Sequence, residues 1–543
     1  MDQKVINAFE KCGIAPRCGI REKREVMLLH RSGLKFETYF AFPDVDGPAP
    51  TIAVRTCYPN QMDQFQTMAE GFAKLGYVFA FQFCRGIQKS EGEWNPNVNE
   101  RQDGLDFIHA LCQMEEVGDI GYFGCSYLAL TGWCMADAVP DRVKTMYLTH
   151  YGTSRFTSAY QDGLFRHDIL TAWAMGNAGY PIEADLMQSI LHRPHVNVDV
   201  DLWGGELPWY REYIVNTSRA DAHWQTGFWK QLEEIPKHVT IPLYIGTGWY
   251  DHHFGSTMKT YEVLNPACKA QSLLRIGCWR HNFDPCADDQ VMENLENDDF
   301  LMAIRWFEKV LREGGRFPHT MQTYTVGEDQ WHNVQGERVT KEKCFYLAPD
   351  ALKAEAGNYG EVAYDYDPDH PHFAVGGDSL FKHKNDVGSR LVPMDDRDDE
   401  LIFCSDVLQE DITIAGSVSV KLHVASDCED TAFYARLLEE RNGKRYHVRG
   451  SITTLSYRNH SDLPQDYAPN SIVPISIDMW DIDYQLKKGS RLILQITSSY
   501  TPEYSVHLNG KGPFSLQKDA KIAHQTVFCT EEYPSRVVLP TRA

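Results

Sequence analysis

Short apolar segments alternate with amphipathic helical segments over the first 150 residues, and this alternation constrains the fold more than any other feature. The expected strands cover residues 51–58, 77–86, 119–126 and 143–152. The expected helices cover residues 62–77, 101–114 and 128–140. Such alternation predicts an α/β fold, in which a parallel sheet is covered by helices on both faces.

The pattern changes twice, which predicts three structural units. Residues 153–235 lose the alternation and carry helical periods rich in Trp, Tyr and His, which indicates an inserted helical cap. After residue 316 short alternating strands dominate, beginning with TMQTYTVG (320–327), and indicate a β-sandwich of the jelly-roll kind. We therefore expect an α/β domain of residues 1–152 and 236–315, a cap of residues 153–235 and a C-terminal all-β domain of residues 316–543.

The net charge and the pattern of cysteines indicate which partners the protein can bind and in which cellular compartment it resides. A formal net charge of -22 argues against nucleic acid and against an anionic membrane surface. The 14 cysteines are scattered without any C-x-x-C pair, as in a protein with reduced thiols, and no signal peptide or membrane span is visible. We expect a cytoplasmic protein that acts on a small molecule.

Two pairs of histidines are candidate metal ligands. They are His192 with His195 and His370 with His372, and neither pair has a cysteine or carboxylate at ligand spacing. The prediction is that the chain uses no metal and no other cofactor.

The sharpest local motif is Gly124-Cys125-Ser126-Tyr127-Leu128, at the junction of an expected strand and an expected helix. A serine on such a turn presents its hydroxyl above the sheet as a nucleophile. Leu128 replaces the second glycine of the usual G-x-S-x-G pattern. The alternatives are that Ser126 only caps the helix, or that Cys125 is the nucleophile.

A serine nucleophile needs a base and a carboxylate that orients the base. Asp251 and His281 each follow an apolar strand at its carboxyl end, in the expected order Ser, Asp, His. His252 and His253 compete with His281 for the role of base, although both stand very close to Asp251 in sequence.

The negative oxygen of a tetrahedral intermediate needs hydrogen-bond donors. One candidate is the backbone N–H of Tyr127, the residue after the nucleophile. The other is the hydroxyl of Tyr58, which ends an earlier strand.

The chain resembles the cocaine esterase family, which is related to X-Pro dipeptidyl-peptidases and α-amino acid ester hydrolases. The resemblance extends over nearly the whole chain, with its motifs in the family's order. These motifs include CRGIQKSEGEW (84–94), IGYFGCSYLA (120–129), GTGWYDHHFG (246–255), IGCWRHN (276–282) and LKKGSRLILQITSS (486–499).

The resemblance implies an α/β-hydrolase core with an inserted helical cap and a C-terminal jelly roll. It implies a triad of Ser126, Asp251 and His281, and it strengthens the assignment of Tyr58 to the oxyanion hole. It also places Trp173, Tyr160 and His253 in the substrate pocket, where His253 replaces an aromatic residue. Family members often form homodimers.

We expect a serine hydrolase that cleaves a small carboxylic ester or amide through an acyl-enzyme. A second hypothesis is an X-Pro dipeptidyl-peptidase or α-amino acid ester hydrolase, which would need carboxylates to anchor a free substrate amine. The cap offers Asp162, Asp168, Glu183 and Asp185 for this purpose. A third hypothesis is a binding protein on the same fold, which would normally have lost a triad residue.

Overall fold

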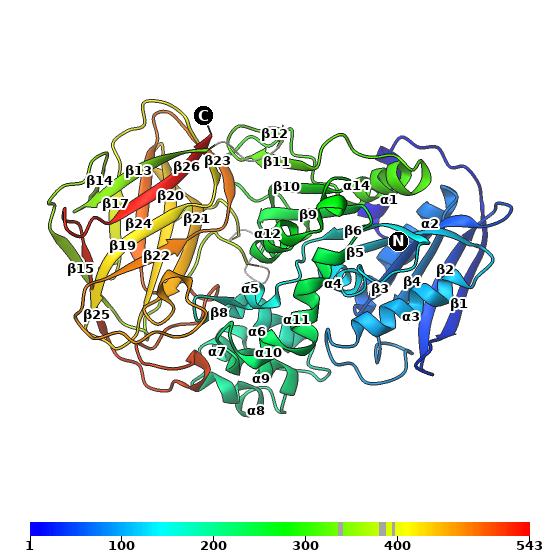
Figure 1. Cartoon of the computed structure of the whole chain (residues 1–543), viewed down its shortest axis with the longest axis horizontal. Helices are drawn as coiled ribbons and strands as arrows, with labels where there is room; N and C mark the ends of the chain where they lie inside the picture. The colour runs from blue at the N-terminus through cyan, green and yellow to red at the C-terminus, as the bar shows by residue number, and fades with distance from the viewer. Residues whose placement is uncertain (335–339, 380–386, 394–396, 543) are drawn as a thin grey trace.

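The computed structural model describes residues 1–334, 340–379, 387–393 and 397–542 (Figure 1). A mixed sheet of ten strands forms one side of the molecule, in the order β1-β2-β4-β3-β5-β6-β9-β10-β11-β12. Its strands are β1 (Ile20–Leu29), β2 (Lys35–Pro43), β3 (Ala49–Thr56), β4 (Val78–Phe83), β5 (Val117–Cys125), β6 (Val143–Thr149), β9 (Leu243–Tyr250), β10 (Leu273–Arg280), β11 (Met321–Thr325) and β12 (Gln330–Asn333). The seven strands from β4 to β11 in this order are parallel to one another.

The parallel arrangement does not extend to the two edges of the sheet. β1 and β2 form an antiparallel hairpin that joins β4, and β12 runs antiparallel to β11. Burial alternates along β1, residue by residue, because one face of this edge strand packs on the protein and the other faces solvent.

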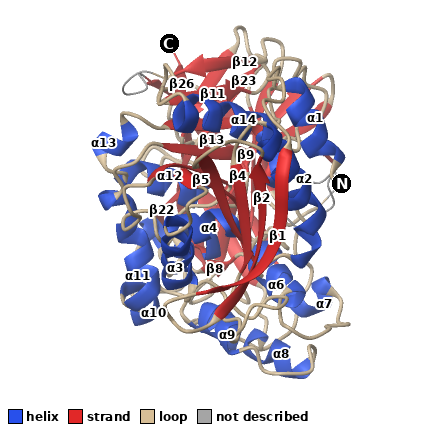
Figure 2. Ribbon diagram, turned by 90° about the vertical axis from the view of Figure 1, so that its right-hand side faces the viewer, coloured by secondary structure: helices blue, strands red, loops and turns tan. Residues whose placement is uncertain are grey.

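Helices cover both faces of the sheet (Figure 2). They include α2 (Met62–Lys74), α3 (Glu100–Cys112), α4 (Tyr127–Trp133), α12 (Phe254–Val263) and α14 (Asp299–Trp306). α4 is shorter than predicted and ends well before Pro140, because the next amides, those of Met135 and Ala136, bond three residues back instead of four. α14 continues as a π-helix from Phe307 to Arg312.

The segment between β6 and β9 folds into a layer of short helices below the sheet in Figure 1. They are α5 (Arg155–Ala159), α6 (His167–Gly176), α7 (Leu186–Ile190), α8 (Val198–Asp201), α9 (Pro208–Val215), α10 (Ala222–Gln225) and α11 (Gly227–Glu234). Aromatic side chains hold them together, for example Tyr213 and Trp224, whose ring centroids lie 5.9 Å apart. None of the helices in the described ranges is both long and apolar enough to cross a membrane.

The C-terminal part is all-β, as the yellow to red strands of Figure 1 show. Its longest strands are β13 (Thr340–Ala348), β19 (Ser419–Ser426), β20 (Ala432–Arg441), β21 (Lys444–Thr454) and β24 (Arg491–Thr497). The interpretation of residues 320–327 as the first strand of this part is wrong. β11 pairs in parallel with β10 instead, because the crossover through α14 returns the chain to the edge of the first sheet.

The all-β part also supports the strand that leads to Asp251. The hydroxyl of Tyr250 donates to the backbone oxygen of Val448 at 3.1 Å, and the Arg449 guanidinium donates to the backbone oxygen of Trp249. Arg449 is almost completely buried and also pairs with Asp378 at 2.8 Å. The carboxyl end of β9 is thus held from outside its own sheet.

Candidate active site

Ser126 lies on a tight turn between β5 and α4. Its backbone has φ 58° and ψ −126°, a conformation that a non-glycine residue adopts only where the surroundings enforce it. A Cβ at Gly124 would lie 2.2 Å from the backbone oxygen of Leu128, so strand and helix approach too closely for any larger residue. Leu128 itself is accommodated because its side chain packs into the core. The turn therefore has the geometry of a nucleophile elbow.

Ser126, His281 and Asp251 come together at the carboxyl edge of the parallel strands. Ser126 Oγ lies 2.9 Å from Nε2 of His281, and Nδ1 of His281 lies 3.0 Å from Oδ1 of Asp251. Ser126 makes no side-chain hydrogen bond to the start of α4, so the interpretation of this residue as a helix cap is wrong. The arrangement can transfer a proton from the serine to the imidazole.

The Asp251 carboxylate is fully buried and held on several sides. Besides His281, it accepts hydrogen bonds from the Thr247 hydroxyl at 3.1 Å and from the backbone N–H of His253 at 3.1 Å. Burial opposes its ionisation, but the imidazoles of His150 and His281 and the hydrogen bond from His281 hold its pKa well below the usual range. It therefore remains an anion beside His281.

Two further histidines surround His281, and sequence reasoning did not find their positions. The ring of His252 lies 4.4 Å from that of His281, and the ring of His150 lies 5.1 Å from it. Burial lowers the pKa of His252 well below its usual range and that of His150 to about 3, so both are neutral. His150 follows β6 at the same sheet edge as Asp251 and His281, which is the signal that would have found it.

Of the two histidines that competed for the role of base, neither replaces His281 next to Ser126. His252 Nδ1 lies 3.7 Å from Asp251 Oδ1, and His253 Nδ1 lies 2.9 Å from the hydroxyl of Ser158.

Asp251, His252 and His281 also lie close enough to share a metal ion, with one ligand atom each within 4.8 Å of the others. An ion there would have to displace the hydrogen bond between His281 and Asp251.

The Cys125 thiol contacts His150. Its sulfur lies 3.7 Å from Nδ1 of the neutral His150, and burial raises the pKa of the thiol far above its usual value. A protonated thiol is a poor nucleophile, which disfavours Cys125 for that role.

The two residues that would supply the oxyanion donors are neighbours, with the ring centroids of Tyr58 and Tyr127 6.3 Å apart. Burial raises the pKa of Tyr58 well above its usual value, so the phenol keeps its proton. The Tyr58 hydroxyl accepts a hydrogen bond from the indole N–H of Trp173 at 3.2 Å, which leaves its own proton available. The backbone N–H of Tyr127 opens α4 and has no partner within the helix.

The side chain of Tyr127 is fixed by a buried polar network. Its hydroxyl donates to Glu100 at 2.9 Å and accepts from the backbone N–H of Asn97 at 2.9 Å. Glu100 in turn pairs with the fully buried Arg55 at 2.5 Å. The network holds the first turn of α4, and with it the Tyr127 amide, in place.

The three predicted substrate-binding residues are found in different surroundings. Trp173 stacks on Tyr127, with ring centroids 6.0 Å apart, so it adjoins the candidate oxyanion hole. His253 is buried, and its ring centroid lies 5.9 Å from that of His281. Tyr160 donates its hydroxyl to the backbone oxygen of Tyr213 at 2.7 Å and lines a separate pocket. A substrate-binding role for these residues stays a prediction.

Most of the chain matches known protein families and a known protein. Residues 32–282 match the model of the X-Pro dipeptidyl-peptidase (S15) family, and residues 316–538 match that of the X-Pro dipeptidyl-peptidase C-terminal non-catalytic domain. Cocaine esterase of Rhodococcus sp. (strain MB1 Bresler) is 25% identical, over 95% of this chain and 97% of that protein.

Two solved structures share the fold. An α-amino acid ester hydrolase has a TM-score of 0.81 at 21% identity, over 97% of this chain and 98% of that one. An aminopeptidase of the marine sediment archaeon Thaumarchaeota archaeon has a TM-score of 0.81 at 18% identity, over 96% of each chain. The α/β architecture with a C-terminal all-β domain is therefore confirmed, and Ser126, Asp251 and His281 all fall within residues 32–282.

Proposed function

Because this chain belongs to the family of serine hydrolases that includes cocaine esterase and the X-Pro dipeptidyl-peptidases, we propose that it cleaves small acyl esters or amides through a covalent acyl-enzyme on Ser126. One observation carries the proposal. Ser126 Oγ, the imidazole of His281 and the carboxylate of Asp251 form a continuous chain of contacts of 2.9 and 3.0 Å.

In the first half of the reaction, Ser126 Oγ attacks the substrate carbonyl carbon while Nε2 of His281 takes the hydroxyl proton. The imidazolium that forms is stabilised by the buried Asp251 carboxylate, which also keeps Nδ1 protonated. His281 then gives its proton to the leaving alcohol or amine as the carbon–heteroatom bond breaks. In the second half, water attacks the acyl-serine with His281 again as base, and the acid is released.

The Tyr58 hydroxyl and the Tyr127 amide are proposed to hold the oxygen of each tetrahedral intermediate. Both donors are fixed before the substrate arrives, Tyr58 by Trp173 and Tyr127 by α4. Donors fixed in this way stabilise developing charge without reorganising during the reaction. Trp173 beside them is our candidate for one wall of the acyl pocket.

The surroundings of four cap carboxylates favour an esterase or amidase over an X-Pro dipeptidyl-peptidase. Asp162 pairs with His460 at 3.0 Å, and Asp168 lies 3.9 Å from the Arg166 guanidinium. Asp185 caps a helix through the backbone N–H of Gln188, and Glu183 is exposed. None of these contacts involves a triad residue, whereas a free substrate amine would need a carboxylate beside it.

Labelling with a fluorophosphonate, followed by peptide mapping, tests the nucleophile. We expect the label on Ser126 and none on the matched variant Ser126→Ala, while Cys125→Ala is labelled like the parent. Labelling elsewhere, or none on a folded protein, would contradict the proposal. Rates on p-nitrophenyl acyl esters and on Gly-Pro p-nitroanilide then separate the two substrate classes, and faster cleavage of the anilide would favour the peptidase.

We also propose three finer properties. The 14 cysteines are all free, which supports residence in a reducing compartment such as the cytoplasm. The family resemblance supports a homodimer, which light scattering would detect. It likewise supports a jelly-roll topology for the all-β part.

A further inference from the structure

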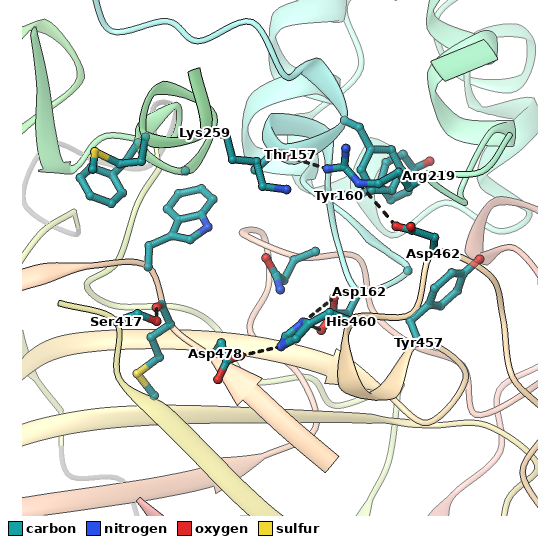
Figure 3. Close-up of a pocket in the computed structure, with 18 of the residues that line it drawn as sticks. Thr157, Tyr160, Asp162, Arg219, Lys259, Ser417, Tyr457, His460, Asp462 and Asp478 are labelled. Atoms are coloured by element: carbon teal, nitrogen blue, oxygen red, sulfur yellow. Dashed lines mark hydrogen bonds and ion pairs between the residues drawn. The ribbon is translucent and has the colours of Figure 1, made fainter. Parts of the chain in front are cut away.

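A second pocket lies where the cap, the α/β part and the all-β part meet (Figure 3). It has a volume of about 380 Å³ and is formed by residues 156–163 of the cap, the first half of α12, and residues 457–462 and 478–481 of the all-β part. None of the three triad residues lines it. Small-molecule sites often form at such junctions and have this size.

The cation on one wall of the pocket is already paired with carboxylates. His460 lies between two carboxylates, 3.0 Å from Asp162 and 2.8 Å from Asp478 (Figure 3). The hydrogen bonds that His460 donates to these carboxylates raise its pKa to about 10, so the ring is an imidazolium whose charge is already compensated. This wall has no spare cation for a ligand.

The opposite wall carries two cations, Arg219 and Lys259 (Figure 3). Arg219 donates to the Thr157 hydroxyl at 2.9 Å and lies 3.5 Å from Glu233 and 3.7 Å from Asp462. Its charge is therefore shared with two carboxylates at a rather long distance.

Lys259 differs from the other cations of the pocket. Within the described ranges, its ammonium group has neither a hydrogen bond nor an ion pair, although the side chain reaches into the pocket in Figure 3. Loss of solvent and the nearby Arg219 guanidinium lower its pKa more than the carboxylates of Glu233, Asp462 and Glu262 raise it. The residue is solvent-accessible, so a diffusing anion can reach it.

Apolar side chains complete the cavity next to this ammonium. They are Phe254, Met258, Met479 and the indole of Trp480. A ligand that satisfies both features has one negative charge and a small apolar body. A dianion such as a phosphate monoester fits less well, because four aspartates also line the pocket and repel the second charge, namely Asp162, Asp462, Asp478 and Asp481.

We propose that this pocket binds a small organic carboxylate, with the carboxylate on the Lys259 ammonium beside Arg219 and the apolar body against Trp480. The site is distinct from the candidate active site and does not depend on the function proposed for that site. α12 supplies Lys259 and begins three residues after Asp251. A single helix therefore connects the pocket with the triad.

Calorimetric titration with benzoate tests the site in the parent, in Lys259→Gln and in the exposed-lysine control Lys4→Gln. We expect saturable binding to the parent and to the control, and at least about tenfold weaker binding to Lys259→Gln, since a charge-assisted hydrogen bond contributes about 1.5–3 kcal/mol. Neutral benzamide should bind the parent more weakly than benzoate by a similar factor. Thermal unfolding of Lys259→Gln at the parent's midpoint would show that the variant is folded.

Three results would overturn the proposal. They are no saturable binding of benzoate to the parent, equal affinity for Lys259→Gln, and tighter binding of phenyl phosphate or inorganic phosphate than of benzoate. Failure of the active-site proposal is recognised separately, since it would change fluorophosphonate labelling and leave the dependence of benzoate binding on Lys259 intact.

Discussion

Replacement of Tyr58 by phenylalanine tests whether its hydroxyl is one of the two oxyanion donors. The change removes a single hydroxyl and keeps the ring that lies 6.3 Å from Tyr127. Because the raised pKa keeps the phenol protonated, the parent presents a neutral O–H donor throughout the range of ordinary assays. The lost interaction exists mainly in the transition state, so kcat should fall while KM changes little.

The size of the effect follows from the hydrogen bonds of the hydroxyl. Trp173 donates to its oxygen at 3.2 Å, so its proton is available to the reacting oxygen. Removal of one such donor lowers kcat by about 10²–10³-fold, or about 2.7–4 kcal/mol. The folded state loses only the acceptor for Trp173, at a cost of about 1 kcal/mol. Activity should therefore fall far more than stability.

The assay is the initial rate on p-nitrophenyl acetate, with the concentration of active enzyme set by fluorophosphonate titration. Tyr366→Phe is the matched control, because it likewise removes one hydrogen-bonded tyrosine hydroxyl, which in Tyr366 donates to the backbone oxygen of His507 at 3.0 Å in the all-β part. A fall in kcat of less than about threefold for Tyr58→Phe would refute the assignment, since a true oxyanion donor contributes far more. An equal fall in the control would show that the effect is structural.

Three further predictions concern the site and the pocket. Asp251→Asn should lower kcat on the same ester by about 10⁴-fold, because the amide no longer holds His281 in the required tautomer, and an effect below about tenfold would contradict the triad. Cys125→Ala should keep kcat within about threefold of the parent, because the buried thiol stays protonated, whereas a loss as large as that of Ser126→Ala would revive the cysteine as nucleophile. His460 should stabilise the fold fully below about pH 6.5, its unfolded pKa, and lose this contribution as the pH rises through its folded pKa of about 10. The unfolding midpoint of His460→Gln should therefore lie below that of the parent at pH 6 and approach it at pH 10, and a pH-independent difference would argue against this linkage.

The local parts of the site could be read from the sequence. The elbow at Ser126 depends on a strand, a tight turn and a helix that follow one another within residues 117–133, and on the small residue Gly124. Asp251 and His281 were identified because each follows an apolar strand, and parallel strands bring their carboxyl ends to one edge. Periodicity, turn chemistry and chain order are sufficient for such conclusions.

The sequence was less informative where a segment's partner decides its place. The strand at 320–327 has the alternation of a sandwich strand, yet β11 joins the first sheet because its partner is β10. α4 ends at Trp133 although the apolar pattern of the sequence continues. The whole helix is buried, so no polar residue marks its end. Local sequence patterns specify whether a segment forms a helix or a strand, but they do not specify which elements it packs against.

The chain alone determined the α/β architecture, the all-β end and the identity of the three candidate triad residues, because these depend on short-range patterns and on order along the chain. Only the tertiary structure placed His150 and His252 against His281, the Trp173 indole against Tyr58 and the unpaired ammonium of Lys259 in a pocket between three parts of the molecule. These contacts join residues distant in sequence or depend on side-chain direction, and the burial and charge that shift their pKa values exist only once the chain has packed.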